Sequence, residues 1–144
     1  MIDALVYRSR AKPSLTETEL ELILLQSRVL NEMRGLTGAL IKQGAEIVQY
    51  LEGPSDALDR TLARITASPH HDALEVLERA SNVERHFDTW HMGFVEFQRQ
   101  HGRATATAQW MDRLPDVREA SARNAPLAVL AERWDAFAAN TRHQ

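Results

Sequence analysis

The chain contains no cysteine, and this absence removes several kinds of site at once. Without thiols there are no disulfides, no thiolate nucleophile, no cysteine-ligated zinc and no iron–sulfur cluster bound through cysteine. The chain also lacks the short motifs of common catalytic sites: it has no P-loop, no GxGxxG, no nucleophile elbow and no HExxH. No local pattern indicates an enzyme, and we expect the protein not to be one.

Neither sign of charge predominates. The 17 Lys and Arg residues and the 20 Asp and Glu residues are well mixed, and the net charge is −3. A basic surface for nucleic acid is therefore not expected. No apolar run approaches the roughly 20 residues that a membrane-spanning helix needs, and the N-terminal residues lack the layout of a signal peptide. We expect a cytoplasmic protein with neither nucleic acid nor membrane as a partner.

Histidine is the remaining candidate for metal binding. His70 and His71 are adjacent, and His86 and His91 follow within the next twenty or so residues. Their spacing matches no zinc pattern, and no clear set of carboxylates accompanies them. We therefore expect no metal site.

The 144 residues, 44% of them apolar, are enough for one globular domain with its own core. Apolar alternation predicts five strands, at 2–8, 37–42, 46–51, 73–79 and 90–97. A capping box formed by Thr16 and Glu19 opens a first helix that ends at Gly35, and a second helix runs from Pro54 to Ser68. The order β-α-β-β-α-β-β predicts an α+β, ferredoxin-like sandwich, with both helices on one face of a mixed five-stranded sheet.

The composition changes after residue 97, so we divide the chain into a domain at 1–97 and a helical extension at 98–144. The extension is predicted to hold a short helix at 105–113, a break between Pro115 and Pro126, and a final amphipathic helix. An exposed apolar sheet face is not tolerated in a soluble monomer. We therefore expect the stripe Leu127, Leu130, Trp134 and Phe137 to cover the second sheet face, where Leu77 and Val95 point.

Gln49 places a carboxamide where the strand at 46–51 is expected to bury its side chain. A buried amide without a partner costs roughly 1–3 kcal/mol. Tyr7 supplies that partner if the first and third strands lie adjacent and parallel, because the two side chains then meet on the helix-covered face. The simpler interpretation is a buried tyrosine satisfied by an amide. The functional interpretation is a Tyr–Gln pair beside a redox cofactor.

Further polar residues face the same side. Ser27 and Asn31 lie one turn apart on the inner stripe of the first helix, and a hydroxyl with a carboxamide suits the polar edge of a flat heterocycle. The alternative is an Asn that satisfies the end of its own helix. Ile23 and Ile65 face each other across a slot or are ordinary core, and Arg64 either reaches a phosphate or is simply exposed.

Trp90 and Met92 are expected to share one face of the last strand through its two-residue period. A methionine near a polar pair makes a soft, adjustable contact. The alternative is again ordinary core packing.

The order and spacing of four clusters resemble the BLUF family of bacterial blue-light sensors, which bind FAD in a ferredoxin-like domain. The clusters are Tyr7-Arg8-Ser9, Ser27-Arg28-x-x-Asn31 running into Gly35-Leu36-Thr37-Gly38, Gln49-Tyr50-Leu51-Glu52-Gly53, and Trp90-His91-Met92, preceded by Arg85-x-Phe87. The resemblance runs from about residue 2 to residue 97.

This resemblance implies roles for single residues. Tyr7 is the photoactive tyrosine, Gln49 is the glutamine whose amide rearranges after light drives electron and proton transfer from Tyr7, and Trp90 and Met92 respond to that change. Asn31 hydrogen-bonds the carbonyl and N3 edge of the flavin. The residues implied to bind the cofactor are Ile23, Ser27, Asn31, Gln49, Arg64, Ile65, His70 and His71. The cofactor is FAD, with FMN as the alternative.

The resemblance has departures at Leu30, Ser68 and His70, where the family usually has a polar residue, an acid and an arginine. They leave open a flavin-free interaction module on the same fold, and a small flavin-dependent redox enzyme is a further alternative. The 45 or so residues after the domain are too few for a cyclase or a phosphodiesterase. We therefore expect a photoreceptor that signals to an unknown partner protein, as a homodimer or higher homo-oligomer.

Overall fold

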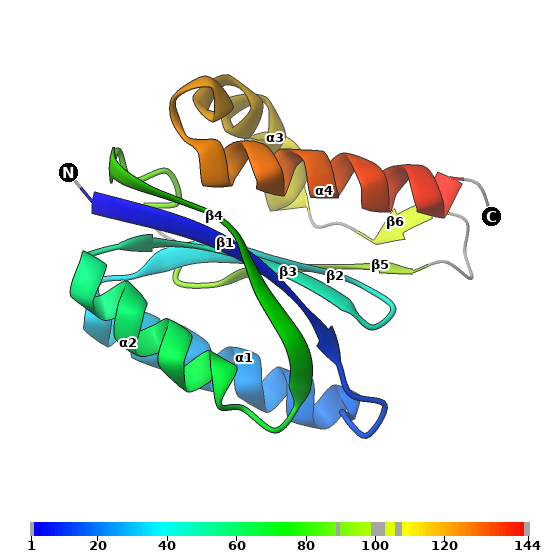
Figure 1. The fold of residues 1–144 in the computed structure, drawn as a ribbon. Helices are drawn as coiled ribbons and strands as arrows, with labels where there is room; N and C mark the ends of the chain where they lie inside the picture. The colour runs from blue at the N-terminus through cyan, green and yellow to red at the C-terminus, as the bar shows by residue number, and fades with distance from the viewer. Residues whose placement is uncertain (1, 89, 99–102, 106–107, 143–144) are drawn as a thin grey trace.

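The computed structural model of this protein describes residues 2–88, 90–98, 103–105 and 108–142, which form one mixed sheet with helices on both faces (Figure 1). The strand order is β4-β1-β3-β2-β5-β6. The strands are β1 (Ile2–Ala11), β2 (Thr37–Gln43), β3 (Glu46–Gly53), β4 (His71–Val83), β5 (Gly93–Gln98) and β6 (Arg103–Thr105). The five predicted strands are all present, so the α+β ferredoxin-like arrangement is confirmed, with β6 as an additional short edge strand.

The direction of the β1–β3 pair differs from our prediction. The two strands are adjacent, but they are antiparallel, with Tyr7 directly opposite Gln49. The reason is the tight β2–β3 hairpin, whose two-residue turn uses Gly44 at a φ of +58°. The hairpin makes β3 run against β2, and the crossover from β1 makes β1 parallel to β2, so β3 opposes both neighbours. The parallel pair is β2 with β5.

Two helices cover one face of the sheet, as predicted. Helix α1 (Glu17–Arg34) begins with the expected capping box: the Thr16 hydroxyl accepts from the Glu19 N–H, and the Glu19 carboxylate accepts from the Thr16 N–H. Gly35 ends α1 at a φ of +70°, a conformation that favours glycine. Helix α2 (Ser55–Thr66) lies beside α1 on the same face (Figure 1).

The C-terminal helices lie on the opposite face, as we predicted (Figure 1). Helix α3 (Ala108–Ala120) and helix α4 (Ala125–Arg142) are joined by a 3-10 turn at Ser121–Arg123. The predicted helix limit before Pro115 is wrong, because Pro115 lies inside α3. A proline in a helix costs about 3 kcal/mol, and burial of its neighbours Leu114 and Val117, at about 1.5–3 kcal/mol each, offsets that cost.

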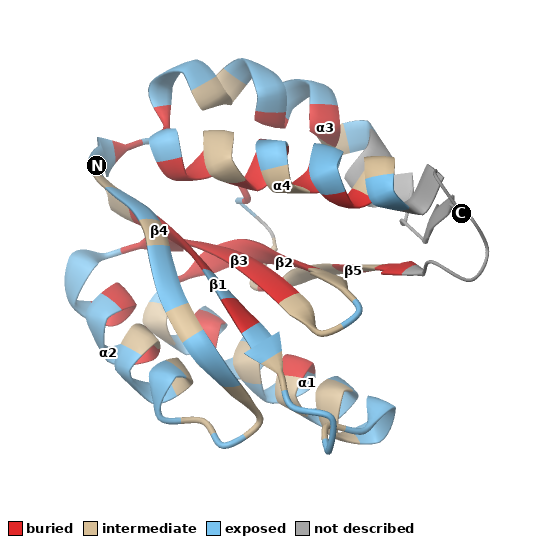
Figure 2. Ribbon diagram, turned by 45° about the vertical axis from the view of Figure 1, so that its right-hand side comes forward, coloured by how far each residue is buried: buried red, intermediate tan, exposed pale blue. Residues whose placement is uncertain are grey.

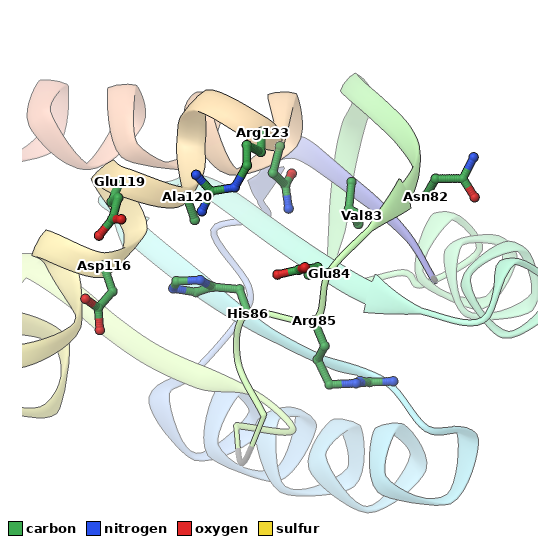
Figure 3. Close-up of a pocket in the computed structure, with 10 residues that line it drawn as sticks. Asn82, Val83, Glu84, Arg85, His86, Asp116, Glu119, Ala120 and Arg123 are labelled. Atoms are coloured by element: carbon green, nitrogen blue, oxygen red, sulfur yellow. The ribbon is translucent and has the colours of Figure 1, made fainter.

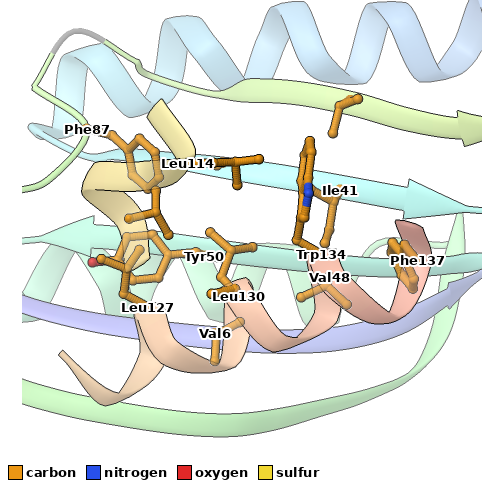
Figure 4. Packing of buried hydrophobic residues seen from close by; sticks show 14 of the residues in the cluster. Val6, Ile41, Val48, Tyr50, Phe87, Leu114, Leu127, Leu130, Trp134 and Phe137 are labelled. Atoms are coloured by element: carbon orange, nitrogen blue, oxygen red, sulfur yellow. The ribbon is translucent and has the colours of Figure 1, made fainter. Parts of the chain in front are cut away.

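The larger of two hydrophobic clusters fills the space between the sheet and the C-terminal helices (Figure 4). Val6, Ile41 and Val48 come from the sheet, and the predicted stripe of α4 packs on them. The Trp134 ring meets Phe97 edge-to-face, with 4.9 Å between the ring centroids. Val95 is buried and Leu77 is partly buried in the same cluster, so both are covered as expected. Figure 2 shows this layering as the largely buried strands β2 and β3 between partly exposed helices, with the edge strand β4 largely exposed.

None of the helices in the described ranges is long and apolar enough to cross a membrane. The smaller hydrophobic cluster lies on the other side of the sheet, under α1 and α2. It includes Leu58 of α2, with Leu62 and Ile65 packed against it, together with Tyr7 and Met92. The site described next is built on this cluster.

If α4 is an integral cover of the sheet, Leu130→Ala will lower the free energy of unfolding by about 2–5 kcal/mol, because Leu130 is 1% exposed and its loss leaves a cavity. Glu132→Ala, at an exposed position of the same helix, is the control and should change it by less than about 0.5 kcal/mol. Urea denaturation followed by circular dichroism measures both. Equal stability of the two variants would show that α4 is not part of the folding unit.

Candidate functional site

A cleft lies between the sheet and the two helices α1 and α2. Strands β1 and β3 contribute Tyr7, Ser9, Ile47 and Gln49 to its lining, and the segment before β5 contributes Met92. The predicted cofactor-binding residues that line it are Ile23, Ser27, Gln49, Arg64, Ile65, His70 and His71. Seven of the eight residues predicted from the sequence therefore meet in one place, although they come from four separate parts of the chain.

A hydrogen-bonded chain of three buried side chains forms the floor of the cleft. The Tyr7 hydroxyl donates a short hydrogen bond to Gln49 Oε1, and Gln49 Nε2 donates to Met92 Sδ over 3.3 Å. Tyr7, Gln49 and Met92 are 3%, 4% and 4% exposed, so water does not compete for these bonds. The amide that required a partner therefore has two, and it connects a strand on one side of β3 to the segment before β5.

Burial also fixes the protonation state of Tyr7. Desolvation raises the pKa of the Tyr7 hydroxyl well above its usual value of about 10, and the nearby positive charge of Arg64 offsets only part of this rise. The hydroxyl is therefore a hydrogen-bond donor at any physiological pH.

The cleft contains polar groups that the protein itself does not satisfy. Ser9 is 2% exposed, and its Oγ has no hydrogen-bond partner among the described residues. His71 contacts the Ile65 carbonyl through Nε2 at 2.6 Å, but its Nδ1 is buried without a partner in the same described part of the chain. Buried polar atoms without partners are rare in native proteins. Two such atoms in one cleft are what a bound polar ligand would leave behind.

Arg64 adds positive charge at the same cleft. Partial burial lowers the pKa of Arg64, and the neighbouring Arg34 lowers it further. Within the part of the chain that the structure describes, no carboxylate forms an ion pair with Arg64. An anionic group on a ligand would stabilise the charged guanidinium and so offset both the desolvation and the repulsion by Arg34. An apolar slot with hydrogen-bonding groups and a cation at one side fits a flavin with its phosphate.

Asn31 is the predicted cofactor-binding residue that does not line the cleft. It is buried at 1% exposure on α1, and its Nδ2 donates to the His91 carbonyl over 2.6 Å. On the same helix, Arg28 Nε donates to the Met92 carbonyl over 3.0 Å. Two side chains of α1 therefore hold the backbone of the segment whose methionine touches Gln49.

Trp90 is placed differently from our prediction. Strand β5 begins at Gly93, so Trp90 and Met92 precede the strand and its two-residue alternation does not apply to them. Met92 packs with Tyr7 under α1, whereas Trp90 packs against the cluster under the C-terminal helices. The Trp90 ring stacks on Phe87, and the Arg113 guanidinium of α3 lies 4.5 Å from the Trp90 ring centroid. The two residues therefore lie on different sides of the sheet.

Glu52 is a residue of structural importance that our sequence analysis did not single out. Its carboxylate is fully buried and accepts from the Thr37 and Tyr50 hydroxyls and from the N–H groups of His86 and Phe87, over 2.6–2.9 Å. The sequence did contain a signal, because Glu52 places a carboxylate at the end of a buried strand, just before Gly53. A carboxylate is tolerated at such a position only if several hydrogen-bond donors surround it. Ser9 was findable from its two-residue spacing to Tyr7.

A separate polar groove lies on the other side of the molecule, between the connection from β4 to β5 and helix α3 (Figure 3). Arg85, His86, Asp116, Glu119 and Arg123 line it, and none of them was predicted to bind a cofactor. Burial lowers the pKa of His86, against the effect of the Glu52 carboxylate. No group of three potential metal ligands occurs among the described residues, in this groove or elsewhere.

The two tyrosines of the chain give a test of this geometry by pH titration. Burial raises the pKa of Tyr50 as well, and the Glu52 charge adds to the rise. A raised pKa in the folded state means that stability is complete below the unfolded value of about 10 and falls as the pH rises above it. Tyrosinate absorbance at 295 nm should therefore stay absent as the pH passes 10 and then appear together with unfolding. Gradual ionisation of half the tyrosine near pH 10, in folded protein, would contradict the burial of Tyr7.

Comparison with known proteins agrees with the site. The model of the BLUF family, described as sensors of blue light using FAD, matches residues 2–93, which is more than half of the chain. A curated relative, the photoactivated adenylate cyclase subunit beta of Euglena gracilis, is 30% identical over 84 residues. That match covers 58% of this chain but only 10% of the relative, so this chain spans a small part of that protein's length.

Solved structures give the same result. The BLUF protein BlrB in its dark state has a TM-score of 0.64 and 32% identity, with 67% of this chain and 73% of that chain covered. BlrP1 of Klebsiella pneumoniae, solved with FMN and cyclic diGMP, has a TM-score of 0.63 and 28% identity, with 67% and 26% covered. The family is one of flavin-binding sensors rather than enzymes. This chain therefore belongs to the BLUF family, the sensors of blue light using FAD.

Proposed function

We propose that this protein detects blue light with a bound flavin and signals through a hydrogen-bond switch made of Tyr7 and Gln49. The observation that carries the proposal is the buried chain from Tyr7 through Gln49 to Met92. This chain lines a cleft in which Ser9 Oγ and His71 Nδ1 lack partners among the described residues. When bound, the flavin supplies the absorption of blue light and an acceptor for an electron and a proton.

The binding residues divide by chemistry. Ile23 and Ile65 supply apolar contact for a flat ring, and Ser27 supplies a polar group for its edge. Asn31 does not line the cleft, and its part is to hold the His91 carbonyl behind the binding residues. Arg64 supplies positive charge for the phosphate, and His70 and His71 supply hydrogen-bonding groups. We propose FAD as the cofactor, after the description of the family. FMN is the alternative, because BlrP1 was solved with it.

The switch follows from the bonding of the Gln49 amide. In the structure its oxygen accepts from Tyr7 and its nitrogen donates to Met92. Rotation by half a turn exchanges these atoms, so that Nε2 faces the Tyr7 oxygen and Oε1 faces the Met92 sulfur. Sulfur bears no proton in methionine, so the second contact is lost. Tyr7 starts the change because its proton is held in a desolvated site until an acceptor receives it.

The signal then leaves through the segment at 90–92. Met92 loses its bond to Gln49, while its carbonyl stays attached to Arg28 and the His91 carbonyl stays attached to Asn31. The Gly38 N–H also donates to the Trp90 carbonyl over 2.8 Å, which connects the segment to β2. Release of the Met92 side chain therefore acts on a segment that is held from several sides. On the opposite sheet face Trp90 meets Arg113 of α3, which carries the change to the C-terminal extension.

We propose that the output is a separate partner protein, with residues 1–97 as the sensor and residues 98–144 as the helical extension that covers it. The named relatives include a photoactivated adenylate cyclase and a protein solved with cyclic diGMP. The departures from the family pattern favour a flavin-free module as the second candidate, since Ser68 and His70 both line the cleft. The colour of the purified protein separates these two functions.

The switch predicts a matched set of variants. Tyr7→Phe and Gln49→Leu should each retain flavin and lose the light-induced red shift of its absorption, because each removes one end of the hydrogen bond. Gln26→Leu is the control, since it makes the same change as Gln49→Leu at an exposed position of α1 that does not line the cleft. Its red shift should be normal. Difference spectra after blue illumination measure all three, and a reversible shift of normal size in Tyr7→Phe would refute the switch.

The cofactor assignment has its own test. The protein should purify yellow, and chromatography of the released flavin should identify FAD. Arg64→Ala should weaken flavin binding about tenfold, the effect of one charge-assisted hydrogen bond worth about 1.5 kcal/mol. Arg60→Ala, an exposed arginine of the same helix outside the cleft, should not weaken it. A colourless protein that takes up neither FAD nor FMN on incubation would instead establish the flavin-free module.

A further inference from the structure

The outward face of α1 carries an apolar stripe that the flavin cleft does not explain. Leu22, Leu25, Val29 and Met33 follow one another at spacings of three, four and four residues, which places them along one side of the helix. They are 54%, 57%, 52% and 77% exposed. Together they are four of the five large hydrophobic side chains that are exposed in the described part of the chain, so the exposure is concentrated on this helix.

The stripe lies on the opposite side of α1 from the cleft. Leu24 and Asn31 are the buried residues of the helix, and Ile23 and Ser27 line the cleft. Nothing within the described chain covers the outward side, and α3 and α4 lie across the sheet (Figure 1). A contiguous, exposed apolar stripe of this kind marks an interaction surface. Spacings of three and four residues are also those of a helix that packs against another helix.

We infer that this surface binds a second copy of this chain, with the two α1 helices antiparallel about a two-fold axis beside Leu25. A two-fold interface requires a surface that complements itself, so charges beside the stripe must be opposite in sign on either side of its centre. Glu21 and Arg28 meet this condition. Both are exposed, both flank the same edge of the stripe, and they lie four residues before and three residues after Leu25.

In this arrangement Glu21 of each copy faces Arg28 of the other. The Arg28 side chain is already positioned, because its Nε donates to the Met92 carbonyl within its own subunit. Its two terminal nitrogens make no hydrogen bond or ion pair among the described residues, so they are available to an acid of the second copy. The antiparallel arrangement also sets the helix dipoles in opposite directions. A single helix pair is smaller than a standard interface, and we expect a dissociation constant in about the micromolar range.

The inference goes beyond the proposed photoreceptor function and depends on no step of it, so it is tested in the dark. Sedimentation equilibrium over a wide range of protein concentration should show wild-type mass approaching twice 16.3 kDa. Leu25→Asn should weaken the dimer at least tenfold. Val76→Asn is the control, since Val76 is the fifth exposed apolar residue and lies on β4, away from α1. It should leave the dissociation constant unchanged.

Charge reversal tests the antiparallel pairing itself. Glu21→Arg alone should abolish the dimer, because the introduced guanidinium would then face Arg28 of the second copy. Arg28→Glu alone should abolish it for the converse reason, since two carboxylates would then face each other. Mixing the two variants should restore a dimer with one copy of each. In that mixed dimer the arginine introduced at position 21 faces the glutamate introduced at position 28, and the unchanged Glu21 of one copy faces the unchanged Arg28 of the other. Far-UV circular dichroism of each variant confirms that it is folded.

Three results would overturn the inference. If the wild-type protein stays monomeric at high concentration, the stripe does not bind a second copy and is instead a surface for a different protein. A dimer that survives Leu25→Asn and Glu21→Arg uses another surface. Failure of the folded charge variants to associate on mixing excludes antiparallel pairing of α1. The wild-type mass and the Leu25→Asn and Glu21→Arg results do not bear on flavin binding or on the red shift, so the proposed function stands or falls separately.

Discussion

The buried carboxylate of Glu52 is the constraint on which the path of the chain between β4 and β5, and with it the position of Met92, depends. A charge in the core is tolerated only when donors surround it, and here they come from β2, from β3 and from the backbone of His86 and Phe87. The donors thereby fix the path of the chain between β4 and β5. That path decides where the segment at 90–92 begins, and therefore whether Met92 reaches Gln49. Glu52 has no part in the proposed photochemistry, yet it sets the geometry of the contact between Gln49 and Met92.

Strand β3 joins the two halves of the molecule because neighbouring residues of a strand point to opposite faces. Gln49 faces the cleft and bonds Tyr7, while Tyr50 faces the C-terminal helices. The Tyr50 hydroxyl donates to Glu52 and accepts from Asn124 Nδ2, and the Asn124 side chain also caps α4 by accepting from the Leu127 N–H. Two consecutive residues, Gln49 and Tyr50, therefore connect the cleft to the first turn of α4. The tail is more than a cover for an apolar surface, because its helix start is bonded to the switch strand.

Much of this arrangement follows from local sequence, and the failures have a common cause. The Tyr7–Gln49 contact was predictable because a buried amide requires a partner and alternation shows which face each residue takes. The capping box and the covering stripe of α4 are equally local. The direction of β1 against β3, the bend that separates Trp90 from Met92, and the helix through Pro115 were predicted wrongly. Each of these depends on contacts between distant segments: the hairpin position, the approach to Gly93, and the burial of Leu114 and Val117.

Helix α1 is the element where the proposed detection and the inferred assembly meet. Its inner side lines the cleft through Ile23 and Ser27, and its outer side carries the exposed apolar residues. Arg28 lies between these sides, and its single bond to the Met92 carbonyl connects the switch segment to the helix edge. Asn31 of the same helix holds the neighbouring His91 carbonyl, so two side chains of α1 join this helix to the segment at 91–92. The inferred dimer surface on this helix is consequently connected to the segment beside Gln49, whereas the edge strand β4 meets the rest of the described sheet through β1.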